Sequence, residues 1–170
     1  LPVSNTVLES IIELELEHED YDLTTSFEMY ETLEGSNNDR YQYVLPSYNF
    51  SKNFFLEGIK GNLNLSSHGN NTLKDTNVTT SKVFNDLNYS SINNFLDNGI
   101  KTNFDIFFKN INTTGKNDAE YKDKLHSRLM SSYTFNASLP MINKTSSTFN
   151  TLEPKLSLRL SPHQMRDNNA

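Results

Sequence analysis

The sequence predicts an all-β fold, an antiparallel meander of about eight strands, and three observations support this prediction. Apolar and polar residues alternate with a period of two along most of the chain, which is the strand period because successive side chains point to opposite faces. No segment has the three- and four-residue apolar spacing of a helix. Asn is abundant and Ala is rare among the 170 residues, and this composition disfavours helices.

The segment 10–34, SIIELELEHEDYDLTTSFEMYETLE, contains two alternations of opposite parity. Apolar residues occupy even positions up to Leu16 and odd positions from Tyr21 onward. Two strands joined by a tight turn at residues 18–20 explain the change, because about 24 residues far exceed the usual strand length of five to six. One long strand with a bulge would also shift the parity by one residue, and it is the alternative.

The alternation recurs in six further segments, each of which we expect to form a strand. In the first, the parity changes at Pro46-Ser47, where a proline without an N–H interrupts the ladder and favours a bulge. Many runs span about 10–13 residues, close to the length of a tilted membrane strand. The longest predicted loop, residues 113–124, is strongly charged. The six segments are residues 39–52, 58–69, 79–91, 99–112, 125–140 and 151–162.

Composition and motifs argue against several classes of function. The chain has no Cys, which excludes disulfides and thiolate metal sites. A net charge of −6 with scattered basic residues makes nucleic acid a poor partner. Enzyme motifs are missing from the sequence, so we expect neither an enzyme nor a cofactor. Glu13, Glu15 and Glu17 form a carboxylate row that could hold a divalent cation, but a solvated strand face explains it more simply.

Two architectures fit the alternation. In a soluble β-sandwich, which would suit a binding or adhesion module, the apolar faces lie inside and the charged faces meet water. In an outer-membrane barrel, the apolar face meets lipid and the charged face lines a hydrated lumen. Strand length, and Tyr and Phe near the strand ends, favour the barrel. The charged residues expected to face its lumen include Lys101, Lys109, Arg128 and Arg159.

Three internal prolines fall within or at the ends of the predicted strands. They are Pro46 in YVLPSY, Pro140 in ASLPMI and Pro154 in TLEPKL. A soluble sheet tolerates proline only on an edge strand or at a bulge, and not in a regular central strand. RYQYVLPSYNF, followed about a hundred residues later by NTLEPKLSLRLSP, resembles the LPS-assembly protein family LptD, also called organic solvent tolerance protein. HEDYDLTTSFEMYETL resembles the hairpin that precedes the Leu-Pro strand in that family.

The resemblance implies that residues 1–170 are a middle slice of a large transmembrane outer-membrane β-barrel. Members of the family have barrels of about twenty-six strands, at the upper end of the usual range. They insert lipopolysaccharide into the outer leaflet of the bacterial outer membrane. By this resemblance we expect the N-terminal jellyroll and the first and last barrel strands to lie outside this segment.

The resemblance also implies the partners of the chain. They are lipopolysaccharide, an LptE-like plug lipoprotein inside the barrel, membrane lipid, and the periplasmic lipopolysaccharide-bridge proteins, which would bind through the N-terminal domain. Lumen Lys and Arg residues could contact phosphate groups or the plug by charge-assisted hydrogen bonds. A porin-like channel is a further alternative, because it shares the alternation but not the proline motifs.

Overall fold

A computed structural model describes residues 6–33, 40–54, 58, 60–75 and 77–162 of the chain. The described residues contain strands and no helix, as the alternating sequence predicts. The strands are β1 (Val7–Glu17), β2 (Tyr21–Thr32), β3 (Tyr41–Phe54), β4 (Gly61–Lys74), β5 (Val78–Ser91), β6 (Asn94–Phe95), β7 (Lys101–Lys116), β8 (His126–Ser138), β9 (Met141–Lys144), β10 (Phe149–Leu152) and β11 (Lys155–Leu160).

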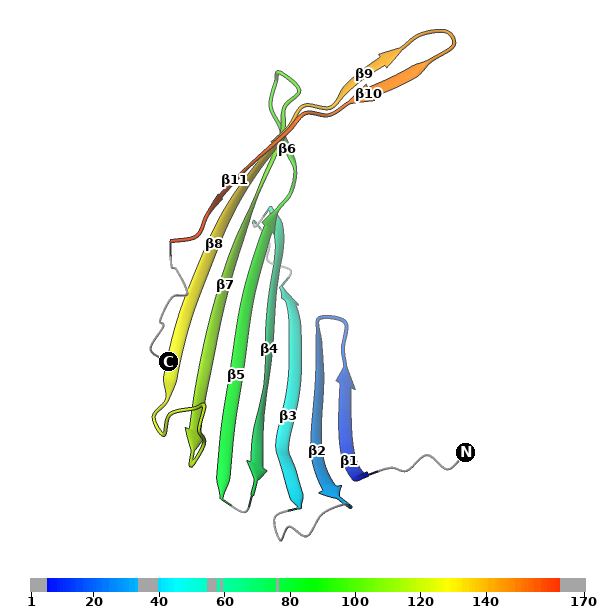
Figure 1. Cartoon of the computed structure of the whole chain (residues 1–170). Helices are drawn as coiled ribbons and strands as arrows, with labels where there is room; N and C mark the ends of the chain where they lie inside the picture. The colour runs from blue at the N-terminus through cyan, green and yellow to red at the C-terminus, as the bar shows by residue number, and fades with distance from the viewer. Residues whose placement is uncertain (1–5, 34–39, 55–57, 59, 76, 163–170) are drawn as a thin grey trace.

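The main sheet is an antiparallel meander in which each strand pairs with the next long strand along the chain. Its order is β1-β2-β3-β4-β5-β7-β8-β11, with the short β6 pairing with β7 (Figure 1). These eight principal strands match the predicted number. The sheet is not closed into a barrel, because β1 and β11 are its two edges.

The predicted hairpin at the start of the chain is confirmed. β1 and β2 pair antiparallel from Val7–Thr32 to Glu17–Asp22, so residues 18–20 form the turn and the bulged single strand is wrong. In the turn, the His18 amide donates to the Tyr21 carbonyl at 2.9 Å. The reversal places the apolar side chains of both halves on one face of the sheet, since Leu16 lies directly opposite Leu23.

The predicted bulge at Pro46 is also confirmed. The register of β3 shifts between Val44 and Ser47 against β4, and the register of β2 shifts between Ser26 and Glu28 against β3. The Leu45–Pro46 peptide is cis. Pro46 therefore lies inside a long strand at the point where ladder pairing is interrupted, which is where a residue without an N–H is tolerated.

The last predicted strand, residues 151–162, is divided at Pro154. Residues Phe149–Leu152 form β10 and pair with β9, whereas Lys155–Leu160 form β11 and pair with β8. Pro140 and Pro154 mark the points where this β9–β10 hairpin leaves the main sheet, and the Leu139 amide donates to the Pro154 carbonyl at 3.1 Å. The hairpin projects beyond the end of the sheet (Figure 1).

The predicted loop at residues 113–124 begins later than expected. β7 continues to Lys116, and Thr113 pairs with His126 of β8. Thr and Gly at positions 113–115 carry no clear alternation, but pairing with β5 extends the strand through Lys116.

The sheet is a single layer with almost no core of its own. Among the described residues, Val44 is the one buried hydrophobic residue, at 7% exposure. Large apolar side chains such as Ile12, Leu129 and Leu158 are more than half exposed. A sandwich formed by this chain alone would place a second sheet over these side chains, and the described residues form no such layer.

Candidate functional site: the polar face of the sheet

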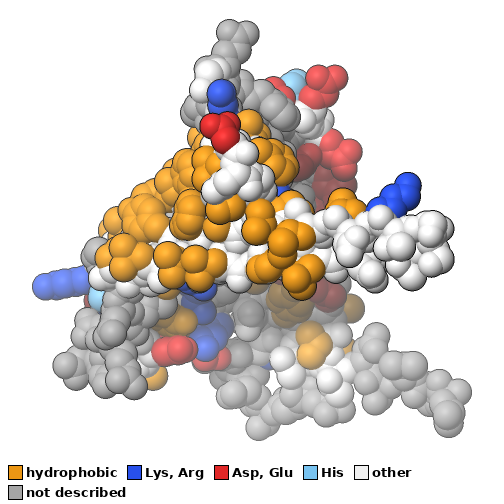
Figure 2. All heavy atoms as spheres, turned by 90° about the horizontal axis from the view of Figure 1, so that it is seen from above, with side chains coloured by type: hydrophobic (Ala, Val, Ile, Leu, Met, Phe, Trp, Pro, Cys, Tyr) orange, Lys and Arg blue, Asp and Glu red, His pale blue; other side chains and the backbone are white. Residues whose placement is uncertain are grey.

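The pairing register divides the side chains of the main sheet into two faces. Residues directly opposite each other in an antiparallel ladder point to the same side. Phe104, Ile106 and Phe108 of β7 therefore share a face with Phe135 and Tyr133 of β8. We call this the apolar face, and Figure 2 shows hydrophobic side chains gathered side by side on the sheet seen from above.

The apolar runs on the outermost strands are displaced along the strand direction. Leu158, the middle leucine of β11, is in register with Phe104 of β7 through Phe135. Leu14, the middle of the run Ile12, Leu14 and Leu16, is in register with Asn112 of β7. Asn112 lies eight residues beyond Phe104 on the same strand. The apolar band thus crosses the strands obliquely.

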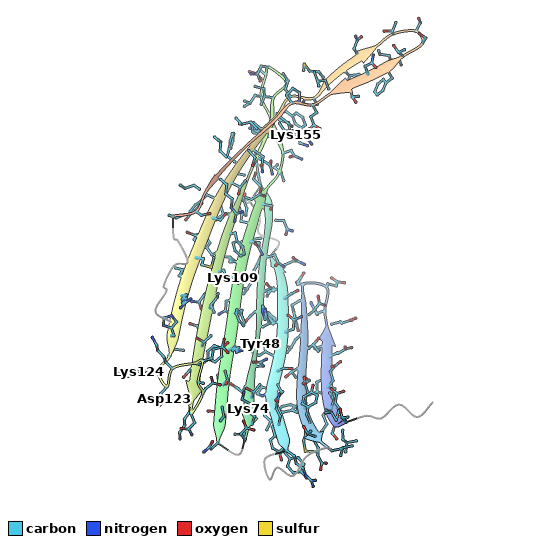
Figure 3. The ribbon with its side chains drawn as sticks, in the orientation of Figure 1. Tyr48, Lys74, Lys109, Asp123, Lys124 and Lys155 are labelled. Atoms are coloured by element: carbon cyan, nitrogen blue, oxygen red, sulfur yellow. The ribbon has the colours of Figure 1, made fainter. Side chains whose placement is uncertain are left out.

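The opposite, polar face carries all four cations predicted to share one face. Lys101 and Lys109 of β7 lie on it, as do Arg128 of β8 and Arg159 of β11. Figure 3 shows Lys109 at mid-height in the sheet, Lys155 near the end from which the β9–β10 hairpin projects, and Lys124 near the opposite end.

Three of the four predicted cations have different immediate partners. The Lys109 ammonium donates to Asp86 Oδ2 at 3.0 Å, and both side chains are mostly buried. Arg128 Nε donates to His126 Nε2 at 2.8 Å, and Arg159 Nε donates to Ser132 Oγ at 3.0 Å. The four residues are thus spread over the polar face and do not converge on one site.

Charge is divided unevenly over the polar face. β1 and β2 contribute only acidic charges to it, whereas β7, β8 and β11 contribute mainly basic ones. The acidic set comprises Glu9, Glu13, Glu15, Glu17, Asp22 and Glu28. Among the described residues no group of three or more His, Asp or Glu side chains could hold a metal ion, so the structure does not favour a cation site at the Glu row.

The loop between β7 and β8 folds over one end of the polar face. Thr80 Oγ1 donates to Asp118 Oδ2 at 2.8 Å, and the Gly115 amide donates to the Lys122 carbonyl at 2.9 Å. The Lys82 ammonium lies 4.5 Å from the centre of the Tyr121 ring. The loop is therefore held against β5 and β7 by several contacts.

Gly115 allows this close approach. A Cβ atom at position 115 would lie 2.6 Å from Tyr121 Cβ, closer than real Cβ contacts allow. Backbone amides of Glu120 and Tyr121, together with the Thr80 hydroxyl, donate to Asp118. These bonds, chiefly the one from the Glu120 amide, lower the pKa of Asp118 below its ordinary value of 3.8.

A hollow of about 230 Å³ lies between this loop and the sheet. It combines basic and apolar side chains with one carboxylate, and one of its basic residues, Arg128, is among the four predicted cations. Its lining residues are Ile111, Thr113, Glu120, Tyr121, Lys122, His126 and Arg128.

A second hollow, of about 350 Å³, lies at the other end of the polar face, and its lining residues include Lys101 and Lys155. Lys155 forms an ion pair with Glu153 at 3.2 Å. Hydrogen bonds from Lys155 and then from Ser138 lower the pKa of Glu153. The two hollows place positive charge at both ends of the polar face.

Two of the polar networks among the described residues were not predicted by the alternation. On the polar face, Glu28 accepts hydrogen bonds from Ser26, Tyr30 and Ser47 beside the Pro46 bulge. The bulge brings Ser47 of β3 beside Ser26 of β2, and its signal in the sequence was the parity change at Pro46.

The second network crosses the apolar face. Hydrogen bonds link five polar side chains on five neighbouring strands into one row, and none of the links is longer than 3.3 Å. Each residue alone looks like a single interruption of its strand, so register was needed to find the row. Its members are Tyr48, Ser67, Asn85, Asn110 and Ser127.

No protein-family model matches the chain. No curated protein matches it either. In the part of the chain that the structure describes, no helix is both long enough and apolar enough to cross a membrane.

Proposed function

We propose that this chain forms part of the wall of an outer-membrane β-barrel that inserts lipopolysaccharide into the outer leaflet of a bacterial outer membrane. The oblique apolar band carries the proposal. Between β11 and β1, which are seven neighbouring-strand spacings apart, the apolar band is displaced by eight residues along the strand direction. At about 3.3 Å per residue and about 4.8 Å per strand, this displacement corresponds to an angle of about 40°.

That angle supports a membrane position for the apolar face. Strands of outer-membrane barrels tilt by about 35–45°, so a horizontal lipid layer contacts each successive strand at a shifted position. The 14-residue strands β3, β4 and β5, tilted by about 40°, would rise about 35 Å, more than the ~25 Å apolar band of such barrels.

Lipopolysaccharide as the cargo is supported by the resemblance of the Leu-Pro and Leu-Glu-Pro motifs to LptD. In this proposal Lys101, Lys109, Arg128 and Arg159 face the lumen. They would donate charge-assisted hydrogen bonds to glycolipid phosphates or to an LptE-like plug. The lipopolysaccharide-bridge proteins of the periplasm would act through a further domain.

The binding experiment compares two variants with equal loss of charge. The first replaces the four polar-face cations Lys101, Lys109, Arg128 and Arg159 with Gln. The control replaces four cations placed elsewhere, namely Lys52, Lys116, Lys124 and Lys144. Both are reconstituted in detergent and titrated with lipopolysaccharide.

We expect the polar-face variant to bind lipopolysaccharide at least tenfold more weakly, because charge-assisted hydrogen bonds contribute about 1.5–3 kcal/mol each. The control variant and dephosphorylated glycolipid test whether the loss is specific for phosphate at this face. Equal affinities of the two variants for lipopolysaccharide would show that the polar face is not the glycolipid-binding surface.

A porin-like channel is the second candidate, and the folded β7–β8 loop favours it. Loops that enter a barrel narrow or plug its lumen, and Asp118 and Tyr121 hold this loop on the polar face. Passage of small sugars into vesicles that contain the chain, without any binding of lipopolysaccharide, would favour the channel.

A further inference from the structure

The row of hydrogen-bonded polar side chains lies on the apolar face, which the proposed function turns toward lipid. It takes one residue from each of five neighbouring strands, β3, β4, β5, β7 and β8, and runs from Tyr48 to Ser127. Polar side chains cost free energy in hydrocarbon, and residues that occupy such positions usually have a function. The place where the row interrupts the apolar residues indicates what that function is.

On β5 the row ends a short apolar run. Tyr89 and Leu87 are the apolar residues on this face between Ser91 and Asn85, a member of the row. At about 3.3 Å per residue and a tilt of about 40°, the six residues from Asn85 to Ser91 rise about 15 Å. The lipid-facing band of an outer-membrane barrel is about 25 Å tall. The apolar run on β5 is therefore too short for such a band.

The strands on either side of β5 repeat this arrangement. On β4, two leucines lie between Gly61 and Ser67, which are again six residues apart. On β7, the eight residues from Thr102 to Asn110 rise about 20 Å at the same tilt. Beyond the row, the next residue on this face of β7 is Asn112. The short run is thus shared by three adjacent strands.

On β2, by contrast, the apolar run has the full height. Ten residues separate Tyr21 from Glu31, the first charged residue on this face, and they rise about 25 Å at the same tilt. Thr25 is the one polar residue between them on this face. The apolar face is therefore tall on β2 and short on β4, β5 and β7.

The bonds within the row leave two donors for acceptors outside the chain. Ser67 Oγ donates to Asn85 Oδ1 at 2.7 Å, and Asn85 Nδ2 uses one of its two protons to donate to Asn110 Oδ1 at 3.3 Å. Ser127 Oγ accepts from Asn110 Nδ2 at 3.1 Å, which leaves its own proton. The ester and phosphate oxygens of lipid headgroups are acceptors that match these donors, since the row itself carries no charge.

We propose that the row from Tyr48 to Ser127 binds the headgroup layer of the leaflet nearer the β7–β8 loop, so that the bilayer is roughly 5–10 Å thinner against β4, β5 and β7 than against β2. A bilayer adapts its thickness to a short apolar surface because the cost per Å of thinning is small. The inference rests on the proposed function only for the placement of the apolar face in lipid.

Trp fluorescence can test the thinning at two matched positions, because the chain has no native Trp. Val83 lies beyond the row on β5, and Met29 lies near the end of the run on β2, both on the apolar face. Register places Met29 four residues beyond the level of Val83. Displaced by eight residues over seven strand spacings, the apolar band moves about 3.4 residues over the three spacings between β5 and β2. The two positions therefore have nearly the same height in a bilayer of uniform thickness.

Val83→Trp and Met29→Trp are compared in phosphatidylcholine vesicles. Acrylamide quenches Trp from the water, and lipids brominated along their acyl chains quench it from the hydrocarbon. We expect acrylamide to quench Val83→Trp about threefold more strongly than Met29→Trp, because position 83 meets headgroups and water. Brominated lipids should show the opposite order.

A second pair of variants tests whether the row causes this difference. The row variant combines Ser67→Ala, Asn85→Leu and Asn110→Leu. The control makes the same three exchanges on the same strands but on the polar face, at Ser66, Asn88 and Asn103. In the row variant, acrylamide quenching at position 83 should fall to within about 1.5-fold of that at position 29, because the apolar run becomes taller. The control should leave the quenching unchanged.

Two results would overturn the inference. Equal acrylamide quenching of Val83→Trp and Met29→Trp would refute the thinning, and a difference that persists in the row variant would show that the row only fixes the register of its strands. Either result, together with intact binding of lipopolysaccharide, would leave the proposed function standing. If brominated lipids quench neither Trp, the apolar face does not lie in lipid, and the proposed function fails as well.

Discussion

The oblique apolar band makes a sharp prediction at two adjacent residues of β7. Ile106 lies on the apolar face between Phe104 and Phe108, at the centre of the band on its strand. Phe107 is its neighbour in sequence but points to the polar face, where its ring lies 5.9 Å from the Lys109 ammonium. Replacing either residue with Arg adds the same charge on opposite sides of the sheet.

The expected costs differ because the two environments differ. An Arg on the lipid-facing side costs about 2–4 kcal/mol at the bilayer midplane, so Ile106→Arg should lower the free energy of unfolding by about 3 kcal/mol. Phe107→Arg loses a cation–π contact of about 0.5–1 kcal/mol and should cost about 1 kcal/mol in total. Burial alone predicts the opposite order, because Phe is the larger apolar side chain.

Reversible urea unfolding in lipid vesicles, followed by circular dichroism, measures both values. The original chain and both Arg variants are compared in the same vesicles. Costs that agree within about 0.5 kcal/mol, or a larger cost for Phe107→Arg, would refute a lipid-facing apolar face. Cooperative folding of the original chain in water without detergent or lipid would refute it as well.

Three further predictions concern the polar face. The pKa of Asp118 is lowered in the folded chain, so its ionised form stabilises the docked β7–β8 loop above pH 3.8, and this contribution is lost as the pH falls through the folded-state pKa. Proteolysis of the loop should therefore increase in acid. Asp118→Asn should remove this pH dependence. Gly115→Ala should displace the loop, because its Cβ would meet Tyr121 Cβ at 2.6 Å, and unchanged fluorescence quenching between labels on the loop and β5 would contradict this. Lys109→Met leaves the Asp86 carboxylate without its ammonium partner and should cost about 2 kcal/mol in urea unfolding, whereas replacing both residues with apolar ones should cost much less.

Local patterns in the sequence predicted most of the strands. The parity change between Leu16 and Tyr21 located the first hairpin, and the change at Pro46 located the bulge. Both are short-range features, because a pleated strand alternates its side chains from residue to residue. The division of the last predicted strand at Pro154 was not foreseen, because β10 is held by pairing with β9, which one strand's pattern does not reveal.

The polar face was predicted more fully than its networks. Alternation alone placed Lys101, Lys109, Arg128 and Arg159 on one face, and the register agrees. It did not predict that Lys109 pairs with Asp86, which is 23 positions away in the sequence. Side-chain contacts across strands depend on register, and one shift of two residues would have changed each of these partners.

The sequence by itself determined that the chain is all-β, roughly where its principal strands lie, and which residues of each strand share a face. These properties follow from a period of two that each strand carries independently of its neighbours. Only the tertiary structure decided how the strands are aligned. Register, which is set by pairing between strands distant in the sequence, produces the oblique apolar band, the row from Tyr48 to Ser127 and the loop folded onto Thr80.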